Sequence, residues 1–142
     1  MKPNIVPAST RSRRYAWLHL GACSIGAAFL LCLAAGAPWG AVTMAGAYPG
    51  VLPPEMRVAS ALQAVLLLSS AAVILACAGV LRRAMPAWAG WAVVAYDGVA
   101  LALNLATPVA LERLLWGPVT AVMLFTSVAV LRGRAGSARA DR

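Results

Sequence analysis

The chain has 142 residues, of which 62% are hydrophobic and 11% are charged, and its mean hydropathy is +0.80. A soluble domain carries about 25% charged residues, so this composition excludes an ordinary water-soluble globular protein. The net charge of +8 would suit nucleic acid, but the cations flank apolar runs in separate groups and form no basic face for a groove. We therefore expect the lipid bilayer, and no nucleic acid, as the partner of this chain.

The N-terminal part predicts a basic tail over residues 1–14 and a first transmembrane helix over residues 15–36. This apolar run is long enough to cross a hydrocarbon core of about 30 Å at roughly 1.5 Å per residue. The basic stretch Arg11–Arg14 resembles the start of a secretory signal, but the run exceeds the roughly 7–15 apolar residues of such a signal. We therefore expect the first helix to be retained.

The next segment, residues 37–56, is rich in glycine and proline, which mark turns, and predicts an outer loop. The second transmembrane helix is expected over residues 57–81. Pro54 and Glu55 precede it and suit the first turn of a helix, where proline loses no hydrogen bond and a carboxylate is favoured. Two consecutive arginines open the short cytoplasmic loop expected at residues 82–86.

The C-terminal half predicts two further transmembrane helices, over residues 87–106 and 111–131, joined by an outer turn at residues 107–110. A threonine followed by a proline in this turn is typical of an N-cap and first helical position. The Gly117–Pro118 pair predicts a kink in the fourth helix. Residues 132–142 are expected to form a solvated cytoplasmic tail.

The distribution of cations predicts the orientation. With a cytoplasmic N-terminus, ten of the twelve basic residues lie inside and only Arg57 and Arg113 lie outside. The excess of cytoplasmic cations then satisfies the positive-inside rule. The expected fold is all-α, an antiparallel up-down-up-down bundle of four transmembrane helices with both termini cytoplasmic. The bias towards Arg, Ala and Gly is typical of a GC-rich bacterial genome, so we expect a multi-pass protein of a bacterial inner membrane.

A set of short motifs carries a resemblance to a known group of proteins. The motifs are GAPWG at 36–40, NLATP at 104–108, the pair Glu112–Arg113 and WGPVT at 116–120. This pattern resembles an uncharacterised family of small four-helix integral membrane proteins of bacteria. The resemblance covers most of the chain from about residue 30 to about residue 125. It implies the four-helix architecture and implies no activity.

Asp97 is the most expensive polar residue of the predicted spans, because an ionised carboxylate near the midplane costs about 2.5–3.5 kcal/mol. Gly90, Asp97 and Asn104 follow at intervals of seven and therefore share one helix face. Matching residues by depth predicts two polar layers: Asp97 with Ser69, Ser70 and Thr120, and Asn104 with Gln63. The carboxyl either couples proton or substrate movement, or takes part in interhelical hydrogen bonds worth about 0.6 kcal/mol each.

Two acids and two bases mark the outer ends of the second and fourth predicted helices. They are Glu55, Arg57, Glu112 and Arg113. Cross-pairing of Glu55 with Arg113 and of Glu112 with Arg57 would join these helix ends, with a contribution of about 0–1 kcal/mol for each exposed pair. Anion binding by either arginine is the alternative.

The cysteines and the single histidine give weak signals for chemistry. Cys23, Cys32 and Cys77 lie in apolar runs without a CxxC pair, so we expect no disulfide framework. His19 is the only histidine, which excludes two histidine ligands to a haem from one chain. Cys23 follows on the same helix face, but one His and one Cys do not predict a metal site. We expect no metal and no cofactor.

These observations predict a small non-enzymatic integral membrane protein, an accessory subunit of a membrane complex. The alternative is a small transporter or channel that uses Asp97 as its coupling carboxylate. Four helices enclose little volume, so a pathway would need a homo-oligomer. An enzyme acting on a lipidic substrate is the least favoured class, because the sequence offers no nucleophile–base pair and no metal cluster.

Overall fold

The computed structural model describes residues 10–140, without the side chains of residue 87 and of residues 137–140. The elements in chain order are α1 (Thr10–Ala35), the short 3-10 helices η1 (Gly40–Val42) and η2 (Met44–Gly46), α2 (Pro54–Cys77), α3 (Ala87–Ala106) and α4 (Ala110–Ala140). The described chain is therefore all-helical, as expected. Its four α-helices are each long and apolar enough to cross a membrane.

Large apolar side chains cover the outside of the helices. Trp88, Leu103 and Leu114 are 70%, 67% and 72% exposed, and many other leucines and valines of α1 to α4 are exposed as well. Soluble monomers rarely expose continuous apolar surface on this scale. The surroundings of these helices are therefore lipid, and the chain is a multi-pass membrane protein.

The C-terminal ends of α1 and α2 are each defined by a glycine in the left-handed region. Gly36, with φ +104°, ends α1, and the amide of Ala37 donates to the carbonyl of Cys32 at 2.9 Å. Gly79, with φ +63°, ends α2, and the amide of Val80 donates to the carbonyl of Leu75 at 2.9 Å. Both are Schellman caps, which need a residue without Cβ at this position. Gly79 therefore ends α2 at Cys77, four residues before the predicted boundary at 81.

The first and last helices, α1 and α4, are longer than the predicted spans. α1 begins at Thr10, inside the stretch 1–14 predicted as a tail, and residues 1–9 of that stretch lie outside the described residues. α4 continues through Pro118 without a break and reaches Ala140, so most of the expected tail 132–142 is helical. The alanines and arginines of this stretch have high helix propensity and its cations favour a helix C-terminus, whereas Gly133 and Gly136 have low propensity.

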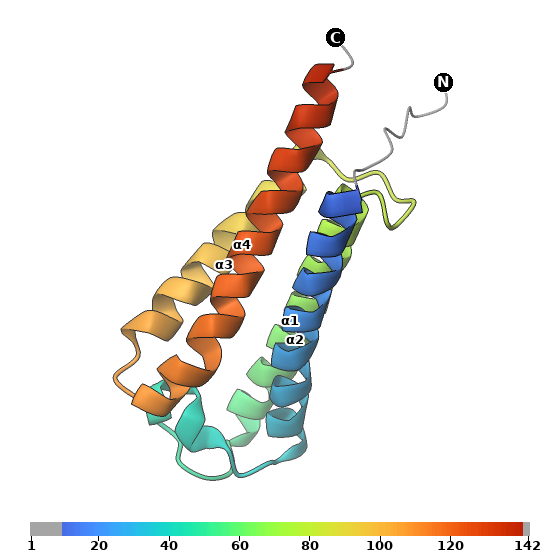
Figure 1. Cartoon of the computed structure of the whole chain (residues 1–142). Helices are drawn as coiled ribbons and strands as arrows, with labels where there is room; N and C mark the ends of the chain where they lie inside the picture. The colour runs from blue at the N-terminus through green and yellow to red at the C-terminus, as the bar shows by residue number, and fades with distance from the viewer. Residues whose placement is uncertain (1–9, 141–142) are drawn as a thin grey trace.

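The helices pack as two pairs. α1 packs along α2 and α3 packs along α4, and α1 also packs against α4, whereas α2 and α3 make few contacts. Figure 1 shows the described start of α1 and the end of α4 at one end of the molecule. The 36–53 segment and the α3–α4 turn lie at the opposite end, which we call the loop end.

The 36–53 segment folds against the helices of the loop end. The Trp116 indole N–H donates to the carbonyl of Val42 at 3.1 Å, which fixes this segment to α4. Phe29 of α1 lies between two tryptophan rings, with its centroid 4.4 Å from that of Trp116 and 5.9 Å from that of Trp39. The GAPWG and WGPVT motifs therefore contribute their tryptophans to one aromatic cluster.

Candidate functional site

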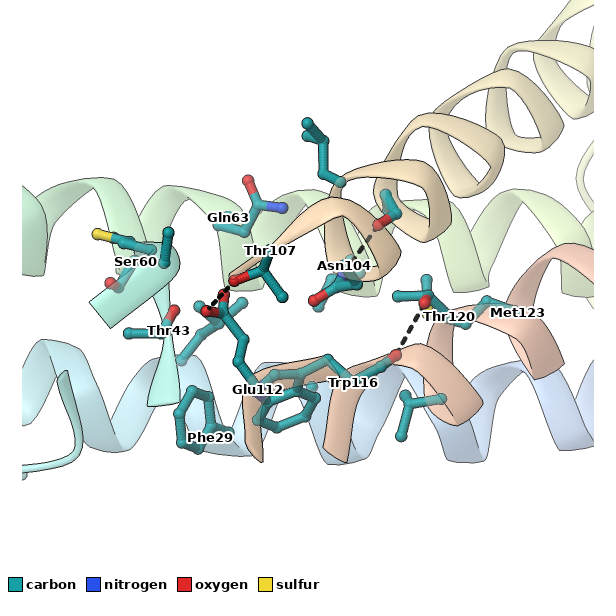
Figure 2. A pocket seen from close by; sticks show the side chains of 18 of the residues that line it. Phe29, Thr43, Ser60, Gln63, Asn104, Thr107, Glu112, Trp116, Thr120 and Met123 are labelled. Carbon is teal, nitrogen blue, oxygen red and sulfur yellow. Dashed lines mark hydrogen bonds between the residues drawn. The ribbon is translucent and has the colours of Figure 1, made fainter. Parts of the chain in front are cut away.

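A cavity of about 590 Å³ lies between the helices at the loop end. Residues of α1, α2, α3 and α4 line it together with part of the 36–53 segment. Most of its walls are apolar or aromatic, with Phe29, Leu30, Tyr96, Leu103 and Trp116 among the larger side chains. Figure 2 shows side chains from the helices and from the segment at Thr43 pointing towards this space.

A strained turn covers one side of the cavity. Met44 and Ala45, which line it, adopt φ values of +50° and +56°, in the left-handed region that residues with a Cβ rarely adopt. Such conformations cost of order 1–3 kcal/mol each and persist only where surrounding contacts enforce them. The Trp116–Val42 hydrogen bond is one such contact, so this turn is held in place from α4.

The seam between α2 and α3 forms another side of the cavity. Ala59 and Gln63 of α2 and Leu103 and Ala106 of α3 line the cavity and are also exposed on the molecular surface. One hydrogen bond crosses this seam, from the Gln63 side-chain amide to the Tyr96 hydroxyl at 2.7 Å. These residues therefore place one side of the cavity at the molecular surface along the seam.

The polar groups of the cavity cluster around Glu112. This residue is only 7% exposed, and its Oε2 accepts a hydrogen bond from the Thr107 hydroxyl at 2.8 Å. The Thr107 oxygen accepts in turn from the Val109 amide at 3.4 Å. In the described part of the chain the Thr107 bond is the only one that Glu112 receives. Figure 2 shows Glu112 pointing towards Thr107 at the wall of the cavity.

The predicted layer of Asn104 and Gln63 is not formed. Both residues line the cavity, but the Asn104 side-chain amide donates to the carbonyl of Ala100 at 2.8 Å, and Gln63 donates to Tyr96. Thr120 also lines the cavity and donates to the carbonyl of Trp116 at 2.8 Å. The sequence therefore identified three polar residues of this cavity and assigned them the wrong partners.

Asp97 lies outside the cavity and is fully buried. Its Oδ2 accepts a hydrogen bond from the Ser127 hydroxyl at 2.7 Å, and its Oδ1 has no partner among the described residues. The expected partners Ser69, Ser70 and Thr120 are wrong. Ser127 follows Thr120 by seven residues, so it shares that face of α4 about two turns further along.

The serines of α2 are occupied by their own helix. Ser69 is exposed and donates to the carbonyl of Val65, while Ser70 is buried and donates to the carbonyl of Leu67. Counting residues from a turn gives depth only, and it does not establish which helix a side chain faces. Because α2 packs mainly on α1, Ser70 lies near Cys23, with the sulfur 3.7 Å from the hydroxyl oxygen.

The predicted ion pairs of the loop end are also wrong. Arg57 donates from Nε to the carbonyl of Ala34 at 2.8 Å, so it caps the C-terminus of α1 and does not contact Glu112. Glu55 and Arg113 are exposed. No ion pair joins these four charges within the described residues. The unpaired carbonyls at the end of α1 offer Arg57 a closer partner than the carboxylate across the bundle.

His19 is fully buried and contacts α4. Its Nδ1 lies 3.1 Å from the carbonyl oxygen of Met123 and 3.2 Å from the Thr126 hydroxyl. A carbonyl only accepts, so Nδ1 carries the proton and Nε2 is the acceptor nitrogen. Nε2 has no partner among the described residues. Thr126 and Ser127 are adjacent, so α4 bonds α1 through one and α3 through the other; the sequence analysis missed both.

The described residues contain no group of three or more His, Cys, Asp or Glu side chains that could hold a metal ion. The cavity therefore offers hydrophobic contact, aromatic faces, a few hydroxyls and amides and one carboxylate. This composition is suited to binding an organic molecule.

Comparisons with protein-family models, with curated proteins and with solved structures found no match to this chain.

Proposed function

We propose that this protein binds an amphiphilic organic molecule from the bilayer in the cavity at its loop end. In this proposal the chain is an antiparallel four-helix protein of a bacterial inner membrane, with both termini cytoplasmic. It acts without catalysis, by itself or as an accessory subunit of a larger complex. The cavity is the observation that carries the proposal.

The dimensions and walls of the cavity support small-molecule binding. Ligand pockets in proteins measure about 300–1,000 Å³ and combine apolar walls with a few polar groups. The cavity of about 590 Å³ falls within this range and has both kinds of wall. Its opening at the α2–α3 seam supports entry from lipid, because the surface around that seam is apolar.

Transport coupled to Asp97 has less support. The carboxyl is fully buried, accepts from Ser127 and does not line the cavity. A coupling group has to meet water or substrate, whereas this geometry is that of an interhelical hydrogen bond between α3 and α4. We therefore place binding at the cavity ahead of transport through Asp97.

The test fills the cavity with one substitution. Ala100 lines the cavity, whereas Ala102 of the same helix is exposed and outside the lining. In the variant Ala100→Phe the ring occupies cavity volume, so we expect loss of the tightly held lipid or other amphiphile that co-purifies with the wild type in mild detergent. Native mass spectrometry measures the retained mass, and Ala102→Phe is the matched control.

Equal retention by the wild type, Ala100→Phe and Ala102→Phe would contradict the proposal. The same spectra report any co-purifying protein, which would identify the chain as a subunit of a complex.

A further inference from the structure

The charge of the cavity suggests the class of its ligand. Among the described residues that line the cavity, Glu112 alone carries a charge. Its carboxylate is largely removed from water and receives one hydrogen bond, from a neutral hydroxyl. A buried carboxylate is strongly destabilised unless several hydrogen bonds or an opposite charge compensate the lost hydration.

The two cations at the loop end, Arg57 and Arg113, do not supply this compensation. Arg113 follows Glu112 directly but is exposed and does not line the cavity. Arg57 is bonded to the carbonyl of Ala34 at the end of α1. Glu112 lies in the first turn of α4, so the helix dipole compensates part of its charge, and a full opposite charge would come from the ligand.

The aromatic walls favour the same kind of ligand. Trp116 follows Glu112 by four residues, so both side chains lie on one face of α4 and both line the cavity. Phe29 packs against Trp116 with a centroid distance of 4.4 Å. The faces of tryptophan, tyrosine and phenylalanine attract organic cations, with contributions of about 0.5–2 kcal/mol that increase when water is excluded.

We propose that the cavity binds a lipophilic organic cation: a quaternary ammonium, a phosphonium or a protonated amine with a hydrophobic body. The positive charge lies beside the Glu112 carboxylate and the Trp116 ring, and the hydrophobic body occupies the apolar part of the cavity towards Leu30 and Leu103. The inference rests on the proposed function and adds the ligand's charge. Anionic lipids are disfavoured, because the carboxylate repels an acidic headgroup.

The test compares two probes of nearly the same size and shape and opposite charge. Tetraphenylphosphonium and tetraphenylborate are titrated separately into the full-length protein in a mild non-ionic detergent, with equilibrium dialysis as the readout. We expect saturable binding of the phosphonium and at least about tenfold weaker binding of the borate, a difference of about 1.4 kcal/mol. This comparison needs no variant, so it holds whatever substitutions do to folding.

Two isosteric variants then locate the charge. Glu112→Gln keeps an acceptor for the Thr107 hydroxyl but removes the negative charge, and we expect phosphonium binding to weaken about tenfold. Glu55→Gln is the matched control, because Glu55 is also an acid in the first turn of its helix but is exposed and outside the cavity. It should bind as the wild type does. Thermal unfolding in the same detergent checks that both variants fold.

The outcomes separate this inference from the proposed function. Equal binding of the two probes by the wild type, or wild-type phosphonium binding by Glu112→Gln, overturns the cationic ligand. Unchanged phosphonium binding by Ala100→Phe overturns the cavity as the binding site. Loss of phosphonium binding in Glu112→Gln, with wild-type retention of a co-purifying neutral amphiphile, supports both the cavity and the role of its charge.

Discussion

At the scale of single residues, two adjacent hydroxyls of α4 organise the buried polar groups. Thr126 lies beside His19 of α1, and Ser127 donates to Asp97 of α3. All four side chains are almost completely inaccessible. The Ser127 hydroxyl has two oxygen neighbours, Oδ2 of Asp97 at 2.7 Å and the carbonyl of Leu124 at 3.1 Å, but one hydrogen. A protonated Asp97 that donates to Ser127 would satisfy all three oxygens.

The substitution Ser127→Ala removes the described partner of Asp97 and leaves a buried carboxyl unpaired. We expect the free energy of unfolding to fall by about 1–3 kcal/mol, the cost of an unsatisfied buried polar group. Denaturation in mixed micelles, followed by circular dichroism, measures this difference. Ser69→Ala is the control, since Ser69 is exposed and bonds only the carbonyl of Val65. A wild-type midpoint for Ser127→Ala would show that this contact contributes no stability.

The residue that the sequence analysis misjudged most is Glu112. Its type and position suggested an exposed ion pair, whereas the structure buries it in a cavity with Thr107 as donor. The four-residue interval to Trp116 was the available signal, because it predicts a shared helix face. Asp97 was identified correctly as a buried residue, because a carboxylate exposed to lipid is costly whichever helix supplies its partner. Its partner needed the rotation of α4, which depth alone does not give.

At the scale of helices, close packing depends on glycine at a few positions. Gly90 of α3 lies towards the end of the bundle opposite the loop end. An added Cβ there would be 2.6 Å from a methyl of Leu131 and 3.2 Å from the Cys77 sulfur. Small residues allow helices to approach closely in membranes, where packing replaces the hydrophobic effect as the force for association. Gly98 of the same helix has no atom within 4 Å of an added Cβ.

The pair Gly90→Val and Gly98→Val tests this packing within one helix. We expect Gly90→Val to destabilise the protein by about 1–3 kcal/mol, the usual cost of overpacking, because Leu131 has to move. Gly98→Val should leave the unfolding midpoint close to the wild-type value. Thermal unfolding in detergent provides the measurement, and equal midpoints for the two variants would contradict the described approach of α3 and α4.

The sequence predicted the helices better than their ends. The four apolar runs correspond to the four α-helices, because length and hydropathy alone define a membrane span. Glycines in the left-handed region then decide two of the ends, and Gly79 was visible in the sequence but was included in the predicted second span. Residues 132–140 have no apolar signal and contain two glycines, which have low helix propensity, so their helix was missed.

At the scale of the whole molecule, the orientation in the membrane remains a prediction from the cations. The groups at Arg11–Arg14, Arg82–Arg83 and Arg132–Arg134 all lie towards one end of the bundle, opposite the loop end. By the positive-inside rule we expect that end to be cytoplasmic and the loop end to face the outside. The cavity then opens into the outer leaflet.

Reporter fusions test this orientation. Green fluorescent protein fused after Arg142 should fluoresce, because it folds when it stays in the cytoplasm, and alkaline phosphatase fused at the same place should be inactive. Alkaline phosphatase inserted between Ala47 and Tyr48 should be active, because it needs an oxidising compartment for its disulfides. The opposite pattern of activity would show that the cations do not set the topology of this chain.

The uneven packing of the two helix pairs has a mechanical consequence. The contact between α1 and α4 holds the two helix pairs together, whereas α2 and α3 make few contacts at their seam. Two described side-chain hydrogen bonds join α2 to the other pair: Gln63 donates to the Tyr96 hydroxyl of α3, and Arg134 of α4 donates to the Cys77 sulfur at 3.6 Å. A small rotation about the α1–α4 contact would widen the α2–α3 seam at the cost of these bonds and of the core contacts of Ile74 and Cys77 with the other pair, while the contacts within each pair would stay intact. Such a rotation would let one chain bind ligands of different width without unfolding a helix.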